Sequence, residues 1–136
     1  MFAYPGVMPP TSPRAAFAGT ISQLQAATID ELVGALSASS EFDIVLQQRD
    51  AWVASVHLLR TALSGLDGFV ALEFTIPRIG SRADAIVIVG GAIFVVEFKV
   101  GESKLQRSDI YQVWDYALDL KYFHSASHSA RVVPVL

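Results

Sequence analysis

The chain contains no cysteine, which excludes disulfide bonds and thiolate metal sites and is typical of a cytoplasmic protein. It also lacks an excess of positive charge, because ten Lys and Arg residues stand against 13 Asp and Glu residues, for a formal net charge of −3. A nucleic-acid partner would therefore have to be held by a local patch and by metal ions, since the protein as a whole is not basic.

Long hydrophobic runs are also missing, although 52% of the 136 residues are hydrophobic. The longest apolar stretch, residues 85–96, is interrupted by a Gly-Gly pair and ends at Glu97, so it is too short to span a membrane. No basic segment precedes a hydrophobic one near the start, so the sequence predicts no secretory signal. The length is that of one domain with a substantial core, and we expect no membrane partner.

Two parts are predicted along the chain. Residues 1–40 form an amino-terminal arm, proline-rich and irregular to about residue 20, and a short helix that begins with the capping-box spacing of Thr28 and Glu31. Residues 41–136 form the core: a helix over about 43–63, a strand over 69–76, a hairpin over 82–99, a helix ending near 123 and a strand over 131–136. We expect Ser103 or Ser108 to cap the later helix. The order predicts an α/β fold with a mixed sheet flanked by helices, and the strand at the end suggests a fragment of a longer polypeptide.

The hairpin carries the main functional signal. Gly90-Gly91 between two β-branched runs favours a two-residue turn with positive φ, so we expect Val89 to pair with Ala92. In that register Asp84 lies directly opposite Glu97. Cross-strand partners share a face, as do residues two apart, so four charged residues gather on one side at one end of the hairpin. These are Arg82, Asp84, Glu97 and Lys99.

Two opposed carboxylates have Cβ atoms about 5 Å apart and repel each other unless one is protonated or cations neutralise both. Two interpretations are open. A hard divalent ion such as Mg²⁺ would suit the pair, and so would a closed salt-bridge network with Lys99 and Arg82. The preceding strand adds a third carboxylate, because an antiparallel pairing of Glu73 with Ile86 would place Glu73 on the same face.

The order of these residues resembles a known family. Asp84 followed by Glu97-Phe98-Lys99, within a helix, three strands, a helix and a strand, is similar to the PD-(D/E)XK nuclease superfamily with its restriction-endonuclease-like core. Gln112 and Tyr116 match the Gln-x-x-x-Tyr pattern of RecB-like members and lie one helical turn apart. More narrowly, residues 72–124 resemble the amino-terminal domain of bacterial proteins that join such a domain to a Schlafen-like, helicase-type ATPase.

The resemblance implies roles for particular residues in phosphodiester hydrolysis of DNA, or less favourably of RNA. Mg²⁺, with Mn²⁺ as a substitute, would be bound by Asp84, Glu97 and the backbone carbonyl of Phe98, and Glu73 would complete the shell or hold a second ion. Lys99 would orient the attacking water or stabilise the transition state. Gln112 and Tyr116 would position the water, the lysine or the phosphate backbone. Apart from the resemblance, Arg82, Lys104 and Arg107 lie in loops or at strand ends near the predicted site, where they could contact nucleic-acid phosphates or simply be solvated charge.

The sequence departs from the family pattern in two places. Ala83 stands where some members have proline, and the first long helix offers only Asp50 where many relatives present an acidic residue. Two other function classes remain open. The chain could be a catalytically silent nucleic-acid-binding or regulatory domain with the same fold, or a structural domain whose apolar surface docks the rest of a longer protein.

Overall fold

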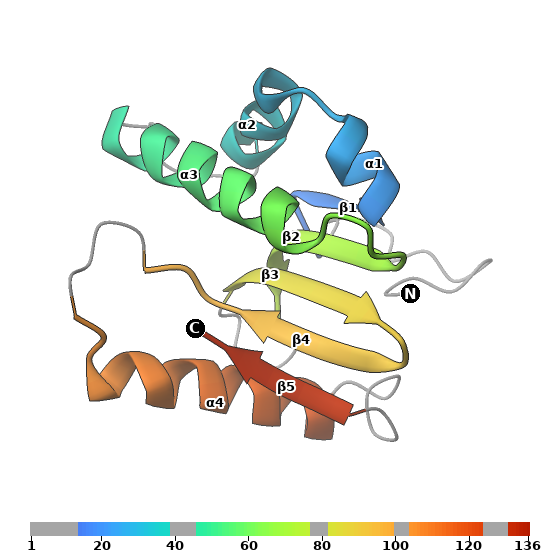
Figure 1. The fold of residues 1–136 in the computed structure, drawn as a ribbon. Coiled ribbons are helices and arrows are strands. Elements are labelled where there is room, and N and C mark those ends of the chain that lie inside the picture. Colours follow the sequence, from blue (N-terminus) through green and yellow to red (C-terminus); the bar gives the residue numbers. More distant parts are fainter. Residues whose placement is uncertain (1–13, 39–45, 77–81, 100–103, 124–130) are drawn as a thin grey trace.

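A computed structural model describes residues 14–38, 46–76, 82–99, 104–123 and 131–136 (Figure 1). They form an α/β fold in which a five-stranded mixed sheet has helices on both faces. The strands are β1 (Phe17–Thr20), β2 (Phe69–Thr75), β3 (Arg82–Val89), β4 (Ala92–Val96) and β5 (Arg131–Val135). The helices are α1 (Ile21–Ala26), α2 (Ile29–Ala38), α3 (Leu46–Ala62) and α4 (Arg107–Phe123). Within these ranges no helix is both long and apolar enough to cross a membrane.

The strands follow one another across the sheet in chain order. The first four are antiparallel neighbours, and β5 returns through α4 to lie parallel to β4. The predicted mixed sheet flanked by helices is therefore confirmed at this level of description.

The hairpin register is also confirmed. Val89 pairs with Ala92, and the ladder continues in step to Ala85 opposite Val96. Gly90 and Gly91 adopt φ values of 58° and 80°, in the left-handed region that a primed turn requires and that glycine enters without steric cost. A glycine pair has thus fixed the alignment of the two strands that carry the candidate acids.

Two apolar layers bury the hairpin from both sides. Helices α1, α2 and α3 cover one face of the sheet, and α4 covers the other (Figure 1). The first layer includes Leu32, Val56, Leu59, Leu72, Ala85 and Val87. The second includes Phe74, Ala83, Ile86, Val95, Val113 and Ala117. Because each face of the sheet has its own core, the strands are held rigidly between them.

The amino-terminal region differs in part from the predicted arm. Phe17–Thr20 is a strand that pairs with β2, and Thr20 then caps α1 in a reciprocal capping box with Gln23. This strand has only four residues, too few to show an alternating pattern. The predicted cap of the following helix is confirmed, because the Thr28 Oγ1 accepts a hydrogen bond from the Glu31 N–H at 3.1 Å. Residues 1–13 lie outside the described ranges.

The start of α4 also differs from expectation. Ser108 is the second residue inside the helix and not its cap, and Ser103 lies outside the described residues. At this end the Asp109 Oδ2 accepts a hydrogen bond from the Gln106 N–H at 2.8 Å. An acidic side chain in the first helical turn thus binds a backbone donor that the helix itself leaves unpaired.

The pairing of β2 with β3 is shifted by two residues from the prediction. Ile86 lies opposite Ala71, not opposite Glu73. A shift of two leaves every side chain on its own face, so the apolar pattern could not distinguish the two registers. The observed one places Glu73 between the pairs Leu72–Ala85 and Phe74–Ala83, directly across from Asp84.

Candidate functional site

The regular alternation of side chains breaks at Glu73 and Asp84. In an undisturbed strand residues two apart share a face, yet Leu72 is buried in the layer under α3 whereas Phe74 is buried in the layer under α4. Ala85 and Ala83 are divided between the layers in the same way.

The break coincides with an unusual backbone conformation. Glu73 has φ = 52°, the only positive value for a non-glycine residue among the described ranges. Left-handed backbone in a residue with a Cβ is unfavourable and is concentrated at functional sites. Here it allows Glu73 and Asp84 to line the same cavity as their neighbour Leu72.

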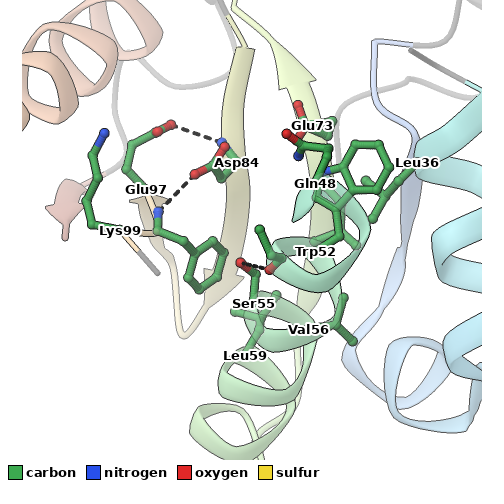
Figure 2. A pocket seen from close by; sticks show the side chains of 13 residues that line it. Leu36, Gln48, Trp52, Ser55, Val56, Leu59, Glu73, Asp84, Glu97 and Lys99 are labelled. Carbon is green, nitrogen blue, oxygen red and sulfur yellow. Dashed lines mark hydrogen bonds between the residues drawn. The ribbon is translucent and has the colours of Figure 1, made fainter. Parts of the chain in front are cut away.

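Asp84 and Glu97 are joined by reciprocal contacts across the open end of the hairpin. The Asp84 N–H donates to the Glu97 Oε1 at 3.0 Å, and the Phe98 N–H donates to the Asp84 Oδ2 at 2.8 Å (Figure 2). Glu97 is 6% exposed, whereas Asp84 is half-buried.

Burial sets the charge of these acids. Removal from water, followed by the nearby charge of Asp84, raises the pKa of Glu97 to about 8. Burial also raises the pKa of Asp84, and burial together with the Asp84 charge raises the pKa of Glu73. With its pKa raised to about 8, Glu97 is mainly protonated at neutral pH. The positive charges of Arg82 and Lys99 act to lower the pKa values of these three acids, but burial outweighs them.

Lys99 supplies part of that charge from an unexpected position. Its Nζ lies 3.3 Å from the Asp109 Oδ1 at the start of α4. Its charge still acts to lower the pKa of both Asp84 and Glu97, although burial outweighs it. Arg82 and Lys99, predicted to face each other, lie beyond the end of the β3–β4 ladder, which stops at Ala85 and Val96. On its other side Arg82 pairs with Thr75 in β2.

A cavity of about 380 Å³ opens beside the acids, between the sheet and α3. One wall carries Glu73, Asp84, Glu97, Phe98 and Lys99, and the α3 wall carries Gln48, Trp52 and Ser55 (Figure 2). From the α3 wall, the Trp52 side chain counteracts the rise in the pKa of Glu73. The cavity has the volume of a small-molecule site, and it offers carboxylates, an ammonium and an amide to whatever enters.

The other predicted site residues lie elsewhere. The Gln112 Nε2 donates to the Tyr116 hydroxyl at 2.9 Å, and neither residue lines the cavity. Tyr116 packs against the core under α4, on the opposite face of the sheet from α3. Lys104 and Arg107 are exposed at and before the start of α4. Arg82 is exposed too, but its charge reaches Glu73 and counteracts the rise in its pKa.

The acids suit a hard divalent cation. Mg²⁺ is usually held by one or two carboxylates, with waters and substrate phosphate completing its shell. Asp84 and Glu97 provide such a pair, and because burial raises the pKa of both, a bound cation would offset the cost of their negative charge. Within the part of the chain that the structure describes, no three acidic or histidine side chains converge as a metal-binding group. Glu73 therefore lies beside the pair and does not complete it.

Several residues of the site were not predicted from the sequence. Gln48 lies four residues before Trp52 on α3 and Ser55 three residues after it, and all three line the cavity, but polar residues at these positions gave no functional signal. Asp109 carried a signal that could have been used. It stands three residues after Gln106, the spacing at which a side chain binds the first free backbone donor of a helix. Asp50, the candidate acid on the long helix, is exposed and does not line the cavity.

Comparisons with known protein families, with curated proteins and with solved structures find no match to this chain.

Proposed function

We propose that this chain is a metal-dependent nuclease domain with a restriction-endonuclease-like core, which hydrolyses phosphodiester bonds in DNA with Mg²⁺. The observation that carries the proposal is the buried pair of Asp84 and Glu97, joined by hydrogen bonds and followed by Lys99 at the mouth of a cavity. Acids in that state have a strong electrostatic preference for a divalent cation. The choice of DNA, and a helicase-type ATPase as the partner domain, rest on the resemblance in sequence alone.

Each residue of the site would have its own role in phosphodiester hydrolysis. Asp84 and Glu97 would hold the metal, which when bound activates water and neutralises charge on the phosphate. Lys99 would place its ammonium beside the scissile phosphate, where negative charge accumulates in the transition state. The α3 wall, through Gln48 and Ser55, offers polar groups to the rest of the nucleotide. The packed layers keep the cavity small and fix these groups before the substrate arrives.

The test is incubation of the protein with linear, nicked and single-stranded DNA in Mg²⁺ or Mn²⁺. We expect hydrolysis that Asp84→Asn abolishes and that Lys99→Ala slows by about 10² to 10³-fold, the usual cost of removing one transition-state donor. Asp115→Asn is the matched control, because it removes a carboxylate from an exposed position on α4 and should leave the rate unchanged. Cleavage that survives Lys99→Ala at full rate would refute the assignment.

A silent nucleic-acid-binding or regulatory domain is the second candidate. It is favoured by the bond between Gln112 and Tyr116, which occupies both side chains away from the cavity, and by the lack of a third converging acid among the described residues. This alternative predicts DNA binding that weakens steeply with salt, with no hydrolysis and no change in melting temperature on adding Mg²⁺ or Mn²⁺.

A further inference from the structure

Asp109 uses its two carboxylate oxygens for different purposes. Its Oδ2 accepts the hydrogen bond from the Gln106 N–H at 2.8 Å, and its Oδ1 lies 3.3 Å from the Lys99 Nζ. The backbone contact is the main cause that lowers the pKa of Asp109, which keeps this group anionic. One side chain thus connects the first turn of α4 to the lysine that follows β4.

The ion pair is anchored at both ends. The Asp109 side chain is 14% exposed and that of Lys99 is 25% exposed, so solvent screens the pair less than it screens an open surface pair. The carboxylate is fixed because α4 is fixed: Val113 and Ala117 are buried in the same core cluster as Val95 of β4. The distance from the start of α4 to the end of β4 is therefore set by packing.

Lys99 has a flexible stem and a compact charge, so its ammonium settles wherever negative charge is closest. Asp84 and Glu97 are the other acids that interact with Lys99, because its charge acts to lower the pKa of both. An ammonium lying between these acids would take the place of a divalent cation. It would also be withdrawn from the substrate.

We propose that Asp109 is a positioning residue, which holds the Lys99 ammonium beside the acid pair so that the pair stays open to the metal and the ammonium stays open to the phosphate. This inference rests on the proposed nuclease function. It adds a fourth member to the site, contributed by α4, the helix that the family resemblance associates with Gln112 and Tyr116.

The experiment is a double-mutant cycle in the full chain with Asp109→Asn, Lys99→Met and the two combined. Asparagine retains an oxygen for the Gln106 N–H but loses the charge, so the helix start is preserved. We expect Asp109→Asn to weaken Mn²⁺ binding about tenfold, within the usual coupling of residues in contact, and to lower kcat more than it raises KM. In the Lys99→Met background the same substitution should leave Mn²⁺ affinity unchanged. Asp109→Glu should restore most of the lost affinity.

Each outcome decides a separate claim. If Asp109→Asn weakens Mn²⁺ binding equally with and without Lys99, Asp109 acts directly through its charge and the positioning role is overturned while the nuclease proposal stands. The same holds if the substitution changes nothing, with Asp115→Asn as the control for charge loss elsewhere on α4. If the wild-type protein neither binds Mn²⁺ nor cleaves DNA, the proposed function is wrong and this inference falls with it. Melting curves of all variants establish that each is folded.

Discussion

The two ends of the β3–β4 hairpin share one ladder but have opposite chemistry. At the turn end, side chains alternate regularly between two dry layers, and the glycines adopt the positive φ values that they tolerate best. At the open end, alternation fails at Asp84, its neighbour Glu73 is in left-handed backbone, and two acids are buried together. The first end follows every local rule of strand structure, and the second departs from several.

The difference separates stability from function. Regular packing at the turn end holds the strands in register, whereas the features of the open end, backbone strain and buried carboxyl groups, each cost free energy. Such features persist only where the surrounding structure enforces them. The contrast therefore predicts opposite responses to mutation at the two ends.

The largest effect on stability should come from a substitution in the regularly packed part of the hairpin, toward the turn end. Ile86 is fully buried in the layer under α4, and Ile86→Ala would leave a cavity in a closely packed core. We expect the free energy of unfolding to fall by about 2 to 5 kcal/mol in denaturant titrations, without a change in the residues of the site. A loss below about 1 kcal/mol would show that this end is not the rigid scaffold described above.

The next effect concerns the proton on Glu97. The folded protein keeps a proton on Glu97 up to a pKa of about 8, whereas the unfolded chain releases it near the ordinary carboxyl value of 4.5. Between these values the native state binds more protons, so stability falls as pH rises, by at most about 1.4 kcal/mol per pH unit for one proton. Thermal melts of the metal-free protein from pH 5 to pH 9 would show this decline.

Glu97→Gln should flatten that pH profile, because glutamine cannot lose the proton. Glu31→Gln, at an exposed position in α2, is the matched control and should leave the slope intact. A wild-type melting temperature that rises from pH 5 to pH 8 would contradict the buried acid pair.

The smallest effect tests the strained backbone. Glu73→Gln and Glu73→Gly both remove the carboxyl group, but only glycine relieves the left-handed φ of 52°. We expect Glu73→Gly to be more stable than Glu73→Gln by about 0.5 to 1 kcal/mol, since the relief of strain exceeds the added entropy of the unfolded chain. Thr75→Gly, in the same strand, should be destabilised. Equal stability of the two Glu73 variants would mean that the strain is not significant.

The same contrast explains what could be foreseen from the sequence. The apolar runs around Gly90-Gly91 obey local rules, so they predicted the turn and the register, which the ladder keeps as far as Ala85 opposite Val96. The open end is set by interactions between distant segments. No local sequence pattern predicts the break in alternation at Glu73. The two-residue shift of β2 was not predictable either, because each side chain stays on its own face of the sheet in both registers.

The contacts made by long side chains were also not predictable from the sequence. Lys99 was placed by strand parity next to the acids and across from Arg82, yet the start of α4 brings Asp109 within 3.3 Å of it. Gln112 and Tyr116 do share a helical face, as predicted, but that face leads to their mutual hydrogen bond and not to the cavity. Helical spacing fixes which residues are neighbours on a helix, and tertiary packing decides where that face points.

Calorimetric titration of the protein with Mn²⁺ at pH 7, in buffers of different ionisation enthalpy, tests directly whether the acid pair binds a metal ion. If Asp84 and Glu97 form a metal site, one ion should bind and release about one proton, and both Asp84→Asn and Glu97→Gln should abolish the binding. Binding that persists in both variants, or no binding by the wild-type protein, would contradict the account.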